Sequence, residues 1–254
     1  MSLTKTKIPY LTHTWGVCGW GCSKKCDGCW ACQYALTRGQ NMKCPKCRAF
    51  EPHWHRDKMP DPCRHKAAVI GVAFYADLFD EARNYQDIRC VFRTAAGAPQ
   101  HNYVFLTQQF KRCADALDLW SCEEDPTPNW HIGLTVHNQP DVERARDAFR
   151  GSLWPVWLSY EPAHGPVYIL ADFPNLSGIV VGCDNRPGMM WTDTWANIVV
   201  RQVKGRAPIF IKQIRNARGT LLTNPADFPE SLRLRELPWG EQLCRQTPPP
   251  MEPK

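Results

Sequence analysis

The stretch HIGLTVHNQPDVERARDAFRGSLWPVWLSY, residues 131–160, decides the fold because it holds a complete strand–helix–strand unit. Its two ends are short, nearly continuous apolar runs, as is typical of strands buried on both faces of a sheet. Between them, Val142, Ala145 and Phe149 recur at the spacing of one helix face. The unit predicts two parallel strands joined by a crossover helix.

The same alternation extends over much of the chain. Apolar runs of this kind lie at residues 67–75, 103–107, 131–137, 155–160, 178–183 and 208–213. A further strand near residues 8–15 brings the expected total to about seven. No Gly-x-Gly-x-x-Gly sequence follows any of them, which disfavours a dinucleotide-binding open sheet. We therefore expect an α/β fold built as a full or partial (β/α) barrel.

Composition divides the chain into three regions. Residues 1–66 are rich in Cys, Gly, Pro, His and Trp, and are predicted to form a cluster-binding segment joined to the barrel. Residues 67–214 hold the alternating strands and helices of the barrel core. Residues 215–254 are irregular, and their proline-rich end, RQTPPPMEPK, is predicted to be disordered.

Charge and cysteine content bound the function. The formal net charge of +6 is compatible with nucleic acid or another anionic partner but does not require one. No apolar run approaches the roughly 20 residues that a membrane helix needs, and MSLTKTKIPY lacks the apolar core of a secretory signal, so we expect a cytoplasmic protein without a membrane partner. Thirteen cysteines in a reducing compartment more often hold metal or do chemistry than form disulfides, and eight of them lie between Cys18 and Cys63.

The first cysteine group is the C-x3-C-x2-C triplet of Cys22, Cys26 and Cys29. Three thiolates can bind three irons of a 4Fe–4S cluster and leave the fourth iron without a protein ligand. An open iron can bind S-adenosylmethionine (SAM), and electron transfer then cleaves the sulfonium to a 5′-deoxyadenosyl radical. Because Cys18 and Cys32 lie close by, a four-cysteine zinc or cluster site, or no metal at all, stays open.

The second group is the C-x2-C knuckle of Cys44 and Cys47. A knuckle with two further nitrogen or sulfur ligands suits tetrahedral zinc. The candidates for those ligands are His53, His55 and Cys63 downstream and Cys32 upstream. Zinc, an auxiliary cluster and unmetallated loop cysteines all remain possible interpretations.

Polar residues end several of the predicted strands, where a barrel places its ligand site. They are Asp77, Thr107, Gln108, His137, Asn138, Glu161, Asp184, Asn185, Lys212 and Gln213. Any one of them could equally cap a loop, so their collective placement is the stronger signal. We predict that Asp77, Thr107, Asn138, Glu161 and Lys212 bind the cofactor.

A series of motifs follows in order along the chain. They are Thr14-Trp15, Gly21-Cys22, CDGCWA at 26–31, FEPHWH at 50–55, Asp77-Leu78-Phe79, GLTV at 133–136, Glu161-Pro162 and Lys212-Gln213. Together they resemble the phage protein thirty-seven/sixty-eight family, which is related to the radical SAM superfamily. The resemblance implies a SAM-binding barrel of the radical SAM type, with a cluster on the cysteine triplet.

Among the positions that depart from these patterns, two lie in or beside the cysteine triplet. Gly28 lies where radical SAM proteins usually carry an aromatic residue, and Trp30 replaces a tyrosine typical of the family. A phage-type origin would place the protein in the host cytoplasm and favours modification of a nucleic acid or nucleotide. The reaction would need a reductant such as flavodoxin or ferredoxin.

The leading hypothesis is therefore a radical SAM enzyme whose reaction and catalytic residues are unknown. In it, Asp77, Glu161 and Lys212 form hydrogen bonds to SAM or to the substrate. Two alternatives are a zinc-stabilised nucleic-acid-binding module without catalysis, and an iron–sulfur electron carrier or sensor that does not cleave SAM.

Overall fold

The computed structural model describes residues 3–122, 124, 127–169, 173 and 175–240. Within these residues nine strands form one sheet, and their spatial order is their order in the sequence. The strands are β1 (Thr4–Lys5), β2 (His13–Trp15), β3 (Val69–Val72), β4 (Asn102–Thr107), β5 (Trp130–Thr135), β6 (Val156–Tyr160), β7 (Leu176–Gly182), β8 (Ile209–Arg215) and β9 (Leu221–Leu222). Strands β2 to β8 are parallel, whereas β1 and β9 add antiparallel edges.

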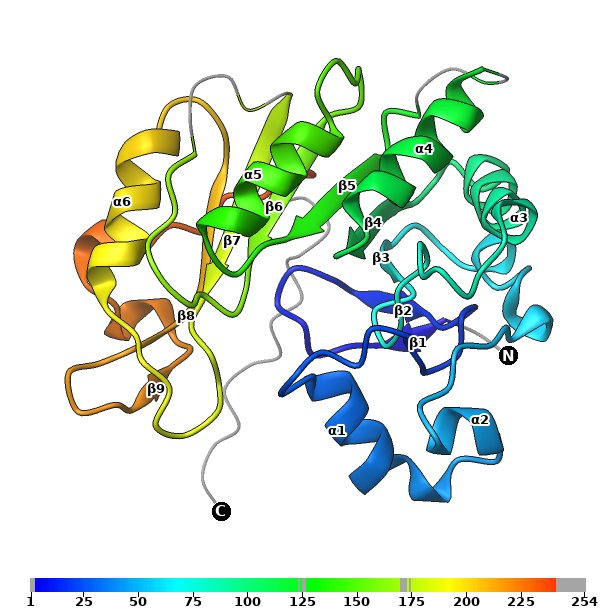
Figure 1. Ribbon diagram of the computed structural model, residues 1–254, viewed down its shortest axis with the longest axis horizontal. Coiled ribbons are helices and arrows are strands. Elements are labelled where there is room, and N and C mark those ends of the chain that lie inside the picture. Colours follow the sequence, from blue (N-terminus) through cyan, green and yellow to red (C-terminus); the bar gives the residue numbers. More distant parts are fainter. Residues whose placement is uncertain (1–2, 123, 125–126, 170–172, 174, 241–254) are drawn as a thin grey trace.

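Helices follow most of the parallel strands. They are α1 (Trp30–Thr37), α2 (Pro45–Arg48), α3 (Tyr85–Ala96), α4 (Phe110–Ser121), α5 (Gln139–Ala148) and α6 (Asp193–Val203). In Figure 1, α3 to α6 lie along one side of the sheet, and α1 and α2 lie apart from them near β1 and β2. Strands that always advance in one direction, through crossovers of one hand, place their helices on the same face. None of the helices in the described part of the chain is long and apolar enough to cross a membrane.

Both faces of the sheet are buried, as the apolar runs predict. On β7, Ile179 and Val181 belong to the large core cluster that the helices cover. Val180, between them, belongs to a second cluster on the opposite face together with Trp157 of β6 and Phe210 of β8. Residues from both ends of the described chain complete this second cluster, whose side of the sheet is called the inner face below. They are Tyr10, Leu11 and Leu237.

The mixed α/β class and the mostly parallel sheet are confirmed, with small differences in extent. The run at 67–75 ends as a strand at Val72 because Ala73 turns into the left-handed region, with φ of 57°. The cysteine-rich segment is continuous with the sheet, since Thr14 of β2 pairs with Gly71 of β3. The proline-rich tail at 241–254, with Cys244, lies outside the described residues.

Candidate functional site

The cysteine triplet lies on the loop that joins β2 to α1, with Cys29 directly before the helix. The loop runs beside the segment after β3, since Gly21 forms a parallel bridge with Ala76. Further along, the backbone N–H and the hydroxyl of Ser23 each donate to Asp80 at 2.6 Å. The triplet is thereby held at the carboxyl end of the parallel strands.

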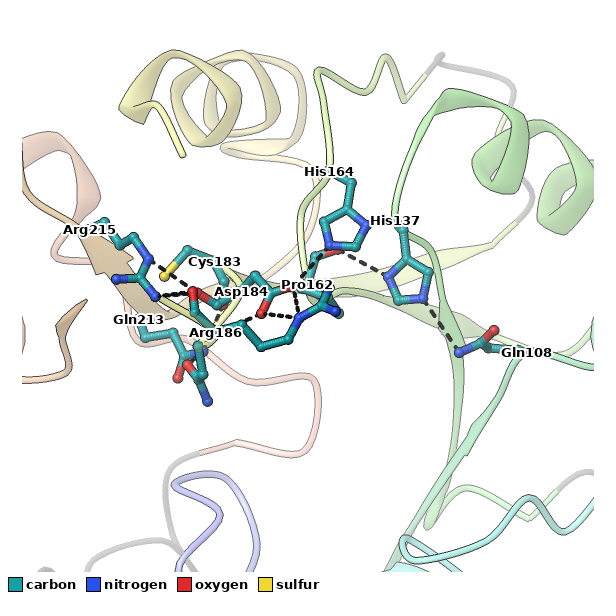
Figure 2. Close-up of polar contacts among 10 residues, drawn as sticks. Gln108, His137, Pro162, His164, Cys183, Asp184, Arg186, Gln213 and Arg215 are labelled. Carbon is teal, nitrogen blue, oxygen red and sulfur yellow. Dashed lines mark hydrogen bonds and ion pairs between the residues drawn. The ribbon is translucent and has the colours of Figure 1, made fainter. Parts of the chain in front are cut away.

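A second contact joins the loop to the end of β4. Nζ of Lys24 donates to Oε1 of Gln108 at 2.8 Å, and Sγ of Cys26 lies 3.6 Å from the same oxygen. Figure 2 shows that the amide nitrogen of Gln108 contacts Nε2 of His137, and that Nδ1 of the same ring contacts the carbonyl oxygen of Pro162. These contacts align the residues that follow β4, β5 and β6.

A third contact comes from the segment after β7. The guanidinium of Arg186 is held by both carboxylate oxygens of Asp184. The same guanidinium lies against Gly28, where an added Cβ would overlap Nη1. Gly28 also has a φ of 67°, which favours glycine. Glycine at position 28 therefore has a local cause, since Arg186 occupies the space of a side chain.

The three thiols are half-buried. Cys22 and Cys29 pack in a small cluster with Trp20 and Tyr75, and burial raises the pKa of Cys22 to about 12. Burial also raises the pKa of Cys26, an effect that the positive charge of Lys24 opposes. In the described chain the three sulfurs are not among the groups close enough to share a single ion. A cubane cluster does not require that, since each thiolate binds a different iron, and three thiols on one loop are the kind of ligand that it takes.

Three of the predicted cofactor-binding residues are engaged in local structure. The Thr107 hydroxyl contacts both carboxylate oxygens of Asp77 at 2.8 Å, and Asp77 also accepts from the backbone N–H groups of Phe79 and Gln108. Burial raises the pKa of Asp77, and these hydrogen bonds oppose the rise. Asn138 accepts from the N–H of Asp141 and so caps α5. Their cofactor role stays a prediction.

Glu161 and Lys212 do come together, from the segment after β6 and from β8. Nζ of Lys212 lies 3.0 Å from Oε1 of Glu161, whose other oxygen is 3.5 Å from the Tyr10 hydroxyl and 3.4 Å from that of Ser159. Burial, with the nearby Glu161 charge, raises the pKa of Tyr10 well above its usual value. A Cβ on Gly182 would come 2.5 Å from Glu161, so glycine there leaves space for the carboxylate.

Sequence reasoning missed how Asp184 organises its surroundings (Figure 2). Nε2 of His164 lies 3.1 Å from its carboxylate, and Arg215 donates to the carbonyls of Asp184 and Arg186. Burial would raise the pKa of the Asp184 carboxyl, but the hydrogen bonds from Arg186 and His164 outweigh it and hold this pKa well below its usual range. The rings of His164 and His137 also stack at 5.5 Å. The sequence signal for Asp184 was its position directly after a predicted strand.

Two of the candidate ligands, His53 and His55, lie beside the cysteine knuckle. Nε2 of His53 lies 3.3 Å from Sγ of both Cys44 and Cys47, and Nε2 of His55 lies 3.4 Å from Cys47. All four donor atoms lie within 4.8 Å of one another, so this group could hold a metal ion. Burial lowers the pKa of both histidines, which favours the neutral ring that binds metals. Cys63 is exposed and Cys32 packs against the small cluster of Ala31, Ala35 and Phe50, so neither joins the group.

A groove of about 580 Å³ adjoins the cysteine loop at the start of α4. Its charged lining residues are Lys24, Lys111, Arg112, Arg144 and Asp147. Lys24 donates to an amide oxygen and Arg112 to two backbone carbonyls, all uncharged acceptors. Lys111 and Arg144 pair with Asp115 and Asp141, but both cations are well exposed, so an anion can compete for them. The surplus of positive side chains makes the groove suited to an anion.

The chain also matches a protein-family model. The model, described as Protein of unknown function (DUF5131), covers residues 5–220, most of the chain. Comparison with curated proteins and with solved structures gives no match. The family description names no reaction, so the chemistry has to come from the residues themselves.

Proposed function

The chain belongs to the DUF5131 family, and we propose that it is a radical SAM enzyme whose 4Fe–4S cluster is bound by Cys22, Cys26 and Cys29. When bound, such a cluster supplies the electron that cleaves SAM to methionine and a 5′-deoxyadenosyl radical. In this proposal the sheet is a partial barrel of the radical SAM type. A reducing cytoplasm would keep the thiols available, and flavodoxin or ferredoxin would supply the electron.

One observation carries the proposal: the triplet loop lies across the carboxyl ends of the parallel strands. It contacts Asp80, Gln108 and Arg186, which follow β3, β4 and β7 respectively. Ligand sites of (β/α) barrels lie at this edge, where side chains from several strands converge. A zinc knuckle alone would not need its cysteines at this edge.

The inner face of the sheet offers groups suited to SAM. The Glu161 carboxylate can accept hydrogen bonds from an ammonium or a ribose hydroxyl, and Lys212 can pair with a carboxylate. Their present contact with each other satisfies both charges, so a ligand with an ammonium and a carboxylate could replace it without leaving either unpaired.

The positive groove beside the loop supports an anionic substrate, which we assign to a nucleotide or nucleic acid. Lys24 belongs both to the groove and to the loop between Cys22 and Cys26. A phosphate held there would lie next to the cluster ligands, where a radical formed from SAM acts. The electrostatic attraction between such a groove and phosphate is independent of base sequence.

Anaerobic reconstitution tests the proposal. The full chain, purified without oxygen, is loaded with iron and sulfide, reduced with dithionite and given SAM, and 5′-deoxyadenosine is quantified. We expect the nucleoside from the wild type and none from Cys26→Ala. Cys63→Ala is the matched control, because Cys63 is exposed and outside both cysteine groups. It should retain full product formation.

The same experiment separates the alternatives. A brown protein that forms no 5′-deoxyadenosine would replace the proposal with an electron carrier or sensor. A colourless protein that binds zinc but no iron would favour the zinc-stabilised nucleic-acid-binding module, for which the group of Cys44, Cys47, His53 and His55 is the supporting observation.

A further inference from the structure

We infer that Cys44, Cys47, His53 and His55 bind one zinc ion in a closed site that holds the backbone at residues 18–21 in place for the cluster ligand Cys22. The four residues are called the Cys2His2 site below. Zinc binding stands independently of the proposed function. Only the last step, the effect on the cysteine triplet, rests on it.

The three sulfur–nitrogen distances fit tetrahedral zinc. With Zn–S near 2.3 Å and Zn–N near 2.0 Å, neighbouring ligand atoms of a tetrahedron lie about 3.3–3.8 Å apart. The three contacts between sulfur and nitrogen are 3.3, 3.3 and 3.4 Å. The two imidazole nitrogens are 2.9 Å apart and would separate by a few tenths of an ångström around the ion. Four protein ligands leave no open position, which is the mark of a structural rather than a catalytic zinc site.

The surroundings also orient the ligands. Nδ1 of His53 lies 2.7 Å from the carbonyl oxygen of Glu51, so it carries the proton and leaves Nε2 free to bind a metal. The backbone N–H of Trp20 donates to Sγ of Cys47 at 3.4 Å. Such a bond stabilises negative charge on the sulfur and ties the site to the chain two residues before Cys22.

The ligand-bearing segment lies directly on the backbone that leads to Cys22. A Cβ on Gly19 would overlap the His53 ring, and one on Gly21 would overlap the carbonyl of Glu51. The N–H of His55 donates to the carbonyl of Val17 at 2.7 Å. These contacts leave the two segments little freedom to move separately.

Buried Arg83 completes the connection. Its guanidinium donates to the carbonyl of His53 at 2.8 Å and to that of Cys18 at 3.2 Å. Only 3% of Arg83 is exposed, so its position is fixed by the surrounding core. One side chain therefore binds both the metal-ligand segment and the start of the cysteine loop.

The segment that carries the ligands has little regular structure of its own. Between residues 39 and 64 the helical elements are only three or four residues long. Helices this short are not stable alone, so another source of free energy must order the segment. Zinc binding can supply it, since the binding free energy of a structural zinc becomes folding free energy.

The first experiment measures metal content on protein made without iron supplementation. We expect one zinc per chain in the wild type and in the triple variant C22A/C26A/C29A, and nearly none in C44A/C47A. Cobalt(II) added to chelated wild type should give the visible bands of tetrahedral cobalt with thiolate ligands. Zinc that survives C44A/C47A, or disappears in the triple variant, would overturn the assignment.

The second experiment uses thiol reactivity to test whether zinc fixes the position of the cysteine triplet, with no cluster present. Alkylation rates of Cys22, Cys26 and Cys29 are followed by mass spectrometry in wild-type protein that is zinc-loaded, chelated, or chelated and refilled. We expect chelation to change the rates several-fold and refilling to restore them. Exposed Cys90 is the internal control and should not respond. Unchanged triplet rates would refute the positioning role.

The link to the cluster is tested last. Zinc-stripped protein should take up less iron on reconstitution than zinc-loaded protein, and equal uptake would contradict the link. If no form of the wild type assembles a cluster, the proposed radical SAM function fails, whereas metal content and thiol reactivity still decide the zinc inference.

Discussion

Arg186 lies directly over Gly28, so close that a Cβ atom on Gly28 would overlap its guanidinium. Gly28 lies between Cys26 and Cys29, whereas Arg186 follows β7, far away along the chain. Asp184 fixes the guanidinium through contacts of 2.8 to 3.2 Å. The arrangement of the cysteine loop, which follows β2, therefore depends on the Asp184–Arg186 ion pair on the segment after β7.

Gly28→Ala tests this contact. The substitution places alanine at a φ of 67°, which costs roughly 1–2 kcal/mol, and it also displaces Arg186. We expect a lower free energy of unfolding in urea and a marked loss of iron per chain after reconstitution. The second effect follows because a displaced Arg186 no longer holds the cysteine loop against the segment after β7.

Gly188→Ala is the matched control. Gly188 has a φ of 76° but open space where its Cβ would lie, so it carries the backbone strain without the overlap. It should lower stability by a similar backbone term and leave iron content unchanged. Equal iron loss in both variants would show that the Arg186 contact does not position the loop.

Asp184→Asn should change how stability depends on pH. The folded protein holds the pKa of Asp184 below its unfolded value of about 3.9, so the carboxylate stabilises the fold above that value. This stabilisation is lost as the pH falls from there toward the folded pKa. At pH 7 we expect the variant to be less stable by about 1–3 kcal/mol, since Arg186 and His164 lose a charged acceptor.

Urea unfolding of both proteins between pH 7 and pH 3 measures the difference. The gap between wild type and Asp184→Asn should be constant near neutrality and shrink once the pH falls below about 4. Loss of metal at low pH affects both proteins alike and cancels in this difference. A stability difference that stays constant from pH 7 to pH 3 would mean that the ion pair does not lower the pKa of Asp184.

The Glu161–Lys212 pair should be strongly coupled. Only 11% of the Glu161 side chain and 25% of that of Lys212 are exposed, so removing one partner leaves the other charge poorly solvated. A double-mutant cycle with Glu161→Gln and Lys212→Met should give a coupling energy of about 1–3 kcal/mol in urea unfolding.

The exposed pair of Asp147 and Arg150 serves as the comparison. Its N–O distance is 2.8 Å, but its side chains are 56% and 73% exposed. The same cycle there should give less than about 1 kcal/mol, because water screens the charges. Equal couplings at the two pairs would contradict the view that Glu161 and Lys212 form a buried, ligand-exchangeable pair.

The parallel sheet was predictable because strands buried on both faces carry continuous apolar runs, which the sequence displays from residue 67 to residue 213. Helix α3 also carried a signal, since Ile88, Val91, Phe92 and Ala95 follow helical spacing after the Asn84 cap. Strands β1 and β9 carried none, because two residues are too few for periodicity.

The candidate sites were predictable only in part. Spacing placed three cysteines on one loop and two in a knuckle, since those distances are local. The pairing of the knuckle with His53 and His55 depends on how the chain folds back through Glu51, which spacing does not encode. Likewise, a polar residue after a strand can face a ligand, as Glu161 does in our proposal. It can instead accept a hydrogen bond from the backbone of its own turn, as Asp77 does from the N–H of Phe79.

The groove beside the cysteine loop should bind single-stranded nucleic acid through phosphate. Fluorescence anisotropy with a labelled oligonucleotide, measured over a range of salt concentrations, reports both affinity and the number of phosphates contacted. We expect the triple variant Lys24→Gln, Lys111→Gln and Arg144→Gln to bind at least about tenfold more weakly. The slope of log affinity against log salt should become shallower by about 2, because each lost contact to a single strand removes about 0.7.

Exposed Lys204, at the end of α6, is not part of the groove, so Lys204→Gln should leave the slope unchanged. A slope that falls equally in both variants would mean that charge alone, and not this groove, attracts the nucleic acid, and the substrate assignment would then lose its structural support.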